Sequence, residues 1–239
     1  MQVLVGTSGY AYKEWKGIFY PEDLPAEGML RFYGGQFQTV EINNTFYRLP
    51  SEKMILNWAA QVPDAFTFVL KASRRITHMK RLKDVKEPLD YLLQTSSGLG
   101  DKLGPTLFQL PPNMKKDVPR LQHFLELFPK RWRAALEFRN VSWYDDEVFD
   151  TLRSHNAALC LADTEDKETP VIATADWGYL RLRRGRYDEE ELLSWSQQIA
   201  DQPWQNAFVF FKHEDQGVGP KLAKQFIDLL PTNPADGDA

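Results

Sequence analysis

Residues Val40–Pro50 read VEINNTFYRLP, and residues Ala135–Trp143 read ALEFRNVSW. Each run begins as a short apolar strand and continues into carboxylate, amide and guanidinium side chains with an aromatic residue just beyond. Polar groups that directly follow a buried strand are held at a fixed position on a rigid element, as binding and catalytic sites require. The two runs therefore predict strand ends that line one shared mouth.

Six more short apolar runs accompany these two along the chain. Several are nearly continuous in β-branched, Leu and aromatic residues, which is typical of strands buried on both faces in a parallel sheet. The eight predicted strands span residues 3–6, 39–42, 66–70, 106–110, 134–138, 158–161, 179–182 and 207–211.

Amphipathic segments fill most of the gaps between these strands, and alternating strands and helices indicate parallel strands with crossover helices. Eight such units in 239 residues predict a TIM-type (β/α)8 barrel, with an open doubly wound sheet as the alternative. Residues 164–177 contain Pro170 and mixed charge, so we expect a short or missing sixth helix. The predicted helices are 29–37, 51–61, 84–94, 118–128, 145–155, 189–200 and 219–230.

Composition indicates one globular domain, which we place at residues 1–231, followed by a flexible polar tail at 232–239. The formal net charge of -4 gives no global positive field for nucleic acid. The single cysteine, Cys160, cannot form an internal disulfide and is expected to be a buried structural thiol in a reducing compartment. No basic leader pattern or long apolar run is present, so the sequence predicts a cytoplasmic protein without membrane association.

Side chains at the carboxyl ends of barrel strands converge on one face. Glu41 and Glu137 lie there between apolar residues, so each needs a cation or hydrogen bonds to stay ionised when buried. They are the candidate catalytic acid and base, with Asn43 and Asp163 as neighbours that bind substrate. An internal salt-bridge network that plugs the barrel is an equally open interpretation.

Basic residues outnumber acidic ones at the predicted mouth. Lys71, Arg139 and Arg181 follow strands, and this excess indicates an anionic ligand, most simply a phosphate group. Arg183 and Arg184 are interpreted instead as solvated loop charges.

Three further residues are candidates for the mouth. His78 and His213 lie in loops after the third and eighth strands, where each could act as a base or hydrogen-bonding group, and Trp143 could stack on a ligand or pack the loop. A divalent metal has weak support because no metal-binding spacing of histidines is present, and Gly6–Gly9 matches no nucleotide-cofactor motif. The candidate metal ligands are His78, His213, Glu41, Glu137 and Asp163.

Five segments in the first three fifths of the chain resemble the YecE-like proteins, known as the domain of unknown function 72. The resemblance implies a TIM-type barrel and supplies no reaction, substrate or catalytic residue. The chain departs from the family pattern late in the sequence, where RLRRG and FKH stand in place of an Arg-x-His-Gly run and Phe-Asn-Asn; the added charge favours an anion. The matching segments are GTSGYAYKEWKGIFYP (6–21), VEINNTFYRLP (40–50), FVLKASRRITH (68–78), LFQLPP (107–112) and LEFRNVSW (136–143).

Three hypotheses about function follow from these residues. The leading one is an enzyme, a hydrolase or isomerase, acting on a phosphorylated or otherwise anionic substrate at the barrel mouth. A noncatalytic module that binds nucleic-acid or nucleotide phosphate is the alternative, and a structural scaffold is the third. Fold alone does not choose among them, since barrels host many unrelated chemistries.

Overall fold

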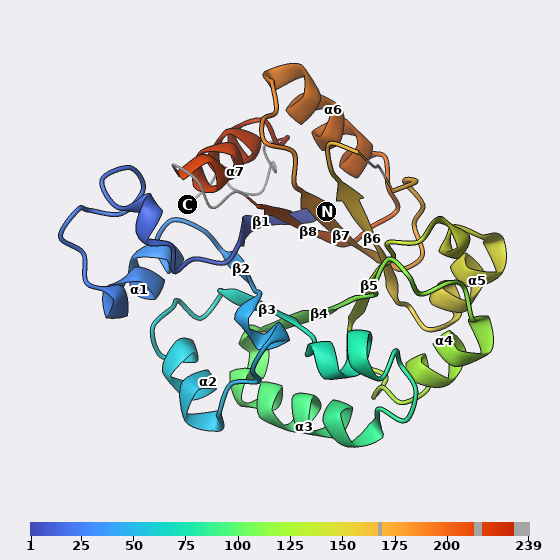
Figure 1. Ribbon diagram of the computed structural model, residues 1–239. Coiled ribbons are helices and arrows are strands. Elements are labelled where there is room, and N and C mark those ends of the chain that lie inside the picture. Colours follow the sequence, from blue (N-terminus) through green and yellow to red (C-terminus); the bar gives the residue numbers. More distant parts are fainter. Residues whose placement is uncertain (167–168, 213–216, 232–239) are drawn as a thin grey trace.

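The computed structural model describes residues 1–166, 169–212 and 217–231. Its eight strands are all parallel and close into one barrel in the order β1 to β8, with β1 paired to β8 (Figure 1). This closure confirms the predicted (β/α)8 barrel and excludes the open sheet. The strands are β1 (Gln2–Ser8), β2 (Thr39–Ile42), β3 (Thr67–Lys71), β4 (Leu103–Gln109), β5 (Ala134–Glu137), β6 (Ala158–Asp163), β7 (Trp177–Leu182) and β8 (Asn206–Phe211).

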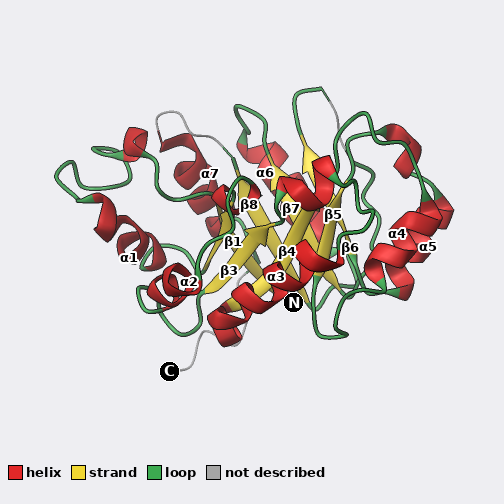
Figure 2. Cartoon of the chain, turned by 60° about the horizontal axis from the view of Figure 1, so that its bottom comes forward, coloured by secondary structure: helices red, strands yellow, loops and turns green. Residues whose placement is uncertain are grey.

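Helices surround the strands on the outside of the barrel, and Figure 2 shows the loops that rise above the strand ends. The α-helices are α1 (Met29–Gly34), α2 (Glu52–Ala59), α3 (Lys86–Ser96), α4 (Val118–Leu125), α5 (Asp146–Ser154), α6 (Glu189–Ala200) and α7 (Val218–Asp228). The loops and connections also contain the 3-10 helices η1 (Lys13–Trp15), η2 (Ala26–Gly28), η3 (Asn44–Phe46), η5 (Ser97–Lys102) and η6 (Val141–Trp143), and the π-helix η4 (Arg75–Met79).

Side-chain caps fix where several helices begin. Ser51, Asp117 and Asp145 each accept a hydrogen bond from a backbone N–H in the first turn of the helix that follows. Asp188 forms a capping box with Glu191 at the start of α6. These contacts satisfy N–H groups that have no partner inside a helix, so each helix starts directly after a capping side chain.

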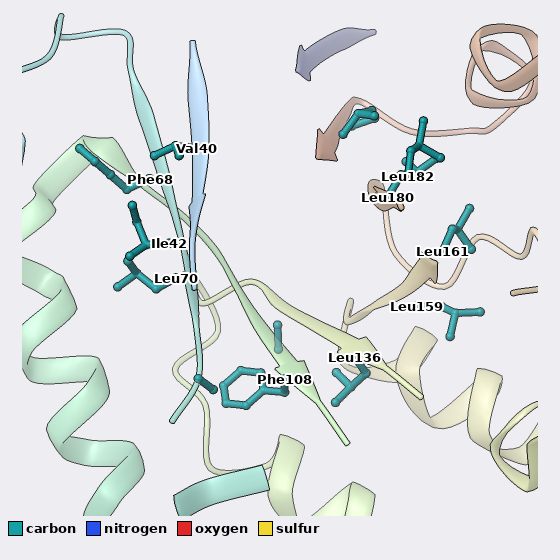
Figure 3. Close-up of a cluster of buried hydrophobic side chains, with 14 of the residues drawn as sticks. Val40, Ile42, Phe68, Leu70, Phe108, Leu136, Leu159, Leu161, Leu180 and Leu182 are labelled. Carbon is teal, nitrogen blue, oxygen red and sulfur yellow. The ribbon is translucent and has the colours of Figure 1, made fainter. Parts of the chain in front are cut away.

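Period-two alternation divides the core into two layers. Val40, Ile42 and Leu136 point outward and pack with the helices, as the close-up in Figure 3 shows for this outer layer. The alternate positions of the same strands point inward, where a smaller apolar cluster fills the barrel. Glu41 and Glu137 occupy inward positions at the strand ends, above that cluster. The inner cluster contains Leu4, Val69, Leu107, Ala135, Ala158, Cys160, Trp177, Tyr179, Phe208 and Phe210.

The connection from β6 to β7 has no helix in the part of residues 164–176 that the structure describes, as the sequence predicted. Thr169 instead attaches the connection to β6, with its backbone N–H donating to the carbonyl of Ala162 at 3.2 Å. This side of the mouth is therefore built from loop rather than from a packed helix.

The long first loop packs onto the barrel through aromatic side chains. Trp15 is buried and contacts Phe19 edge to face, with ring centroids 5.8 Å apart. Phe19 in turn stacks on Phe37, with centroids 5.7 Å apart. These aromatic contacts hold the first loop against the barrel.

Cys160 is buried inside the barrel, as expected of a structural thiol, and burial raises the pKa of its thiol.

None of the helices in the described ranges combines the length and the apolar character that crossing a bilayer requires.

Gly6 lets β1 and β2 approach closely, because a Cβ atom there would lie 2.1 Å from the backbone oxygen of Thr39. We expect Gly6→Ala to lower the free energy of unfolding by about 1–3 kcal/mol, as forced overpacking does. Chemical denaturation measures this loss. Gly185→Ala is the matched control, since the nearest atom to its Cβ, in Glu165, is 3.5 Å away; equal losses in both variants would contradict the close approach.

Candidate active site

Arg181 lies at the centre of the barrel mouth and bridges both candidate carboxylates. Its Nη2 donates to Glu41 Oε1 at 2.8 Å, and its Nη1 donates to Glu137 Oε2 at 2.6 Å. The three side chains come from β7, β2 and β5 and are at most 2% exposed. Their contacts therefore form one buried ionic bridge between three strands.

Glu41 has further partners that hold it ionised. The Tyr179 hydroxyl donates to Oε2 at 2.6 Å, and Asn43 Nδ2 donates to Oε1 at 3.1 Å. Burial alone would raise the pKa of the Glu41 carboxyl, but the Arg181 guanidinium and the Tyr179 hydroxyl outweigh it and lower that pKa. Glu41 is thus a fixed anion in the folded protein.

Glu137 is held even more strongly. Gln109 Nε2 donates to Oε1 at 2.7 Å, Arg139 Nε donates to the same oxygen at 3.2 Å, and Arg183 Nη1 lies 3.7 Å from it. Burial raises the pKa of this carboxyl, but Arg181, Arg139 and Arg183 together outweigh burial and lower it to about 2. Near neutral pH Glu137 is a poor proton donor and a weak base.

Lys71, at the end of β3, is joined to the cluster through Gln109, whose side chain also contacts Glu137. Its Nζ donates to Gln109 Oε1 at 3.1 Å and lies 4.6 Å from the centroid of the Phe46 ring. Burial, then the charge of Arg181, lowers the pKa of the Lys71 amine to about 8. Lys71, Glu137 and Arg181 therefore belong to one electrostatically coupled network.

The charges of this network do not cancel. Four cationic side chains face two carboxylates, which leaves two positive charges in excess. The cationic members are Lys71, Arg139, Arg181 and Arg183.

A cleft of about 550 Å³ opens beside Glu137. Arg139 and Arg183 line it, and so do Glu165 and Asp166, in the β6–β7 connection. Nε of Arg183 is buried without a hydrogen-bond partner in the part of the chain that the structure describes. A ligand that carries both acceptor and donor groups would match this lining. Pro112, Phe138, Val141, Tyr144, Ala162, Thr164 and Thr169 complete the lining.

His78 lies beside the cluster on η4, where its ring contacts the Phe46 ring edge to face with centroids 5.0 Å apart. Its Nδ1 shares a hydrogen bond of 2.9 Å with the Thr77 hydroxyl. Burial and then the charge of Lys71 lower the pKa of His78. The positive charge of Lys71 therefore disfavours protonation of His78.

Asp163 and Trp143 lie away from the cluster. Asp163 faces outward toward α6 and accepts hydrogen bonds from Arg184, Tyr187 and Trp195. Trp143 is buried against Phe138, with parallel rings 4.7 Å apart, and its Nε1 donates to the carbonyl of Met114 at 2.7 Å. The sequence predicted that both residues line the mouth, and the structure places them elsewhere.

His213 lies outside the described residues. Within the described ranges, no three or more His, Cys, Asp or Glu residues are grouped so that they could hold a metal ion. Glu41 and Glu137 are instead joined through Arg181, and Asp163 points away from both.

Two expectations about arginine were wrong. Arg183 is paired with Glu137 and lines the cleft, and Arg184 pairs with Asp163 and Glu191, so neither is a solvated loop charge. Because side chains alternate along a strand, Tyr179, Arg181 and Arg183 lie on the same side of β7 and its extension. This alternation is the sequence signal that places Tyr179 and Arg183 in the site. Gln109 is likewise two residues beyond the inward-pointing Leu107.

The closed parallel barrel and the buried ionic bridge at its mouth define an α/β-barrel protein with a preformed charged site. Residues 4–237 match the family model described as "Protein of unknown function DUF72", and the chain belongs to that family. This match confirms the resemblance to YecE-like proteins.

Individual relatives agree with this assignment. The chain is 30% identical to UPF0759 protein YecE of Escherichia coli over 116 residues, a match that spans 48% of this chain and only 43% of YecE. It is 24% identical to UPF0759 protein YunF of Bacillus subtilis, with 95% of this chain and 94% of YunF covered.

Solved structures carry the same fold. A DUF72 family protein from Thermotoga maritima superposes with a TM-score of 0.84 at 28% identity, over 95% of this chain and 100% of that chain. One from Enterococcus faecalis gives a TM-score of 0.77 at 17% identity, over 97% of each chain.

The depressed pKa of Glu137 predicts how stability depends on pH. The folded carboxyl has a pKa of about 2 against an ordinary value of 4.5, so the unfolded state binds the proton more readily. Its contribution is complete above about pH 4.5 and is lost as pH falls toward about 2, and it amounts to about 3 kcal/mol. Denaturant unfolding of the native protein across this range should reveal the loss.

Glu137→Gln tests the assignment to this side chain. The variant should be less stable at pH 7, because Arg181 loses one buried partner, and its stability should fall less steeply in acid than that of the native protein. Glu14→Gln, on the exposed surface, is the charge-matched control. Parallel acid profiles for the native protein and Glu137→Gln would contradict this prediction.

Proposed function

We propose that the protein is an enzyme that acts on a small anionic substrate, with the anion bound by Arg139 and Arg183 in the mouth cleft. The observation that carries this proposal is that two guanidiniums, of Arg139 and Arg183, line the same cleft and keep 39% and 19% of their side chains exposed. Guanidinium N–H groups that face a cleft are donors for a ligand. An anionic oxygen is the acceptor that suits such a donor best.

The excess positive charge of the network supports the same proposal. Both Nη atoms of Arg181 donate to Glu41 and Glu137, and its side chain is only 1% exposed, so it contributes charge to the mouth without offering a ligand contact of its own. Arg139 is the more accessible guanidinium, with 39% of its side chain exposed. A phosphate or carboxylate placed between Arg139 and Arg183 would pair with both guanidiniums.

The acidic residues of the cleft favour a substrate that also carries hydroxyl groups. Glu165 and Asp166 provide acceptor oxygens there, and one oxygen of Glu165 is already bonded to the backbone N–H of Gly185 at 2.8 Å. A sugar phosphate or a sugar acid combines an anionic group with several hydroxyl donors. Hydrolysis or isomerisation of such a compound is the reaction class that we propose.

In this proposal Glu41 and Glu137 do not act as the catalytic acid and base. Both are ionised and held by several donors, which suits carboxylates that fix the arginines and stabilise positive charge nearby. The free cysteine in the barrel interior supports a reducing compartment, and we retain a cytoplasmic location as part of the proposal.

Replacement of Arg183 tests anion binding directly. We expect Arg183→Met to weaken binding of inorganic phosphate and of ribose 5-phosphate by about 10- to 100-fold, the effect of losing about 1.5–3 kcal/mol in a charge-assisted contact. Calorimetric titration measures both affinities. Arg131→Met removes the same charge from an exposed turn before β5 and should bind as the native protein does. Unchanged affinity in Arg183→Met would overturn the proposal.

A noncatalytic module that binds nucleic-acid phosphate is the second candidate. The β3–α3 connection favours it, because residues 72–85 carry five cationic side chains and one acidic one, Asp84. The connection is also conformationally unusual, with a π-helix and positive φ angles at Arg81 and Leu82. The cations are Arg74, Arg75, Lys80, Arg81 and Lys83.

Salt dependence separates the two candidates. A nucleic-acid module should bind an oligothymidylate with an affinity that falls steeply between roughly 50 and 200 mM salt, because each neutralised phosphate releases counterions. Replacing Arg74 and Lys83 with Met should then reduce the slope. If the protein is the proposed enzyme, its affinity for ribose 5-phosphate should depend only weakly on salt, and the two loop substitutions should not change it. Fluorescence anisotropy with the labelled oligonucleotide measures the nucleic-acid affinity for comparison.

A further inference from the structure

Lys71 differs from every other cation of the mouth network in its partners. Arg139, Arg181 and Arg183 each pair with a carboxylate, whereas no carboxylate of the described chain lies within ion-pair distance of Lys71 Nζ. Its Nζ instead contacts a neutral amide oxygen, in Gln109, and the face of the Phe46 ring. The amine is thus held in place without being neutralised.

The surroundings of Lys71 favour the uncharged amine. The side chain is largely buried and lies near the charges of Arg181 and Arg139, and both conditions disfavour an ammonium group. Glu41 and Glu137 oppose this effect, and the pKa of the amine comes to about 8. About a tenth of the amine is therefore uncharged at pH 7, against far less for an ordinary lysine. Lysines activated in this way are nucleophiles toward carbonyl groups.

Backbone and side-chain contacts also fix the position of Lys71. It ends β3, and its carbonyl accepts a hydrogen bond from the Thr45 hydroxyl at 2.6 Å. Gln109 connects it to the cleft, because the same amide group that accepts from Lys71 donates to Glu137, which lines the cleft. Lys71 therefore lies one hydrogen-bonded side chain away from a residue that lines the cleft.

We propose that Lys71 forms a Schiff base with the carbonyl carbon of an aldehyde or ketone whose anionic group is bound by Arg139 and Arg183. This inference rests on the proposed function and names its substrate class, a phosphorylated or carboxylated carbonyl compound. It assigns to Lys71 a covalent role in place of the anion-binding role expected from the sequence.

The reaction balances with the groups present. The lone pair of Nζ attacks the carbonyl carbon, a C–N bond forms, and the carbonyl oxygen takes a proton while the nitrogen loses one, which gives a carbinolamine. The C–O bond of the carbinolamine then breaks, and its hydroxyl leaves as water after it takes one further proton from solvent. The product is a protonated imine, and no oxidant or reductant takes part.

Neighbouring residues suit the charges and protons of these steps. His78 contacts the same Phe46 ring as Lys71, and with its Nδ1 bonded to Thr77 the other ring nitrogen is the one that can exchange a proton. The lowered pKa of His78 keeps it uncharged near neutral pH, as a proton acceptor must be. The fixed negative charges of Glu41 and Glu137 stabilise the cationic imine.

Reductive trapping tests the proposal on the full-length protein. Glyceraldehyde 3-phosphate is added with sodium cyanoborohydride, which reduces an imine to a stable secondary amine, and intact mass and peptide mapping locate the adduct. We expect one dominant adduct, on the peptide that contains Lys71, with a yield that rises with pH through about 8. Adducts spread over exposed lysines without preference for Lys71 would overturn the proposal.

Two lysine variants provide the matched comparison. Lys71→Arg keeps the charge but cannot form the imine, so the dominant adduct should disappear. Lys116→Arg alters an exposed lysine paired with Asp145 at 3.0 Å and should leave the adduct unchanged. If Lys71→Arg does not fold, as judged by circular dichroism, peptide mapping of the native protein still identifies the labelled lysine.

Comparison with uncharged glyceraldehyde separates this inference from the proposed anion site. Preference for the phosphorylated compound in the native protein, lost in Arg183→Met, supports both. Equal labelling of Lys71 by both compounds would retain the reactive lysine and reject the anion site. Phosphate binding that depends on Arg183, with no adduct on Lys71, would retain the anion site and reject the Schiff base.

Discussion

The ionic bridge from Arg181 to Glu41 and Glu137 is the interaction on which the mouth of this barrel depends. It joins β7 to β2 and β5 across the interior, above an apolar cluster in which the Tyr179 hydroxyl also donates to Glu41. Breaking such a buried pair leaves an uncompensated charge, which is far more costly than never forming it. The same bridge fixes the carboxylate that pairs with Arg139 and Arg183, so the stability of the mouth and the proposed anion site share one set of contacts.

Much of the fold could be predicted from the sequence, because eight apolar runs separated by amphipathic segments leave few other arrangements. The inward direction of Glu41, Glu137 and Arg181 also follows from alternation with outward residues such as Val40 and Ile42. The same rule places Asp163 outside, in phase with Leu159 and Leu161, although its polar character suggested the mouth. For Asp163, the alternation of side chains along the strand predicts the correct direction, whereas its polar character does not.

Other parts of the site could not be predicted, because they depend on which strands become neighbours and on the paths of loops. The pairing of Arg181 with two carboxylates joins residues 140 and 44 positions apart in the sequence. The approach of Phe46 and His78 to Lys71 depends on two separate connections, one of which contains a π-helix. The burial of Trp143 likewise depends on Met114, in a different loop.

The β6–β7 connection has a consequence for how relatives of this protein can diverge. Its described part contributes Glu165 and Asp166 to the cleft lining, whereas Val171 and Ile172 pack against the outer core. Substitutions at Glu165 and Asp166 can exchange acceptors for donors without exposing that core. The specificity of the proposed substrate site can therefore change at these two positions while the ionic bridge of Arg181 stays intact.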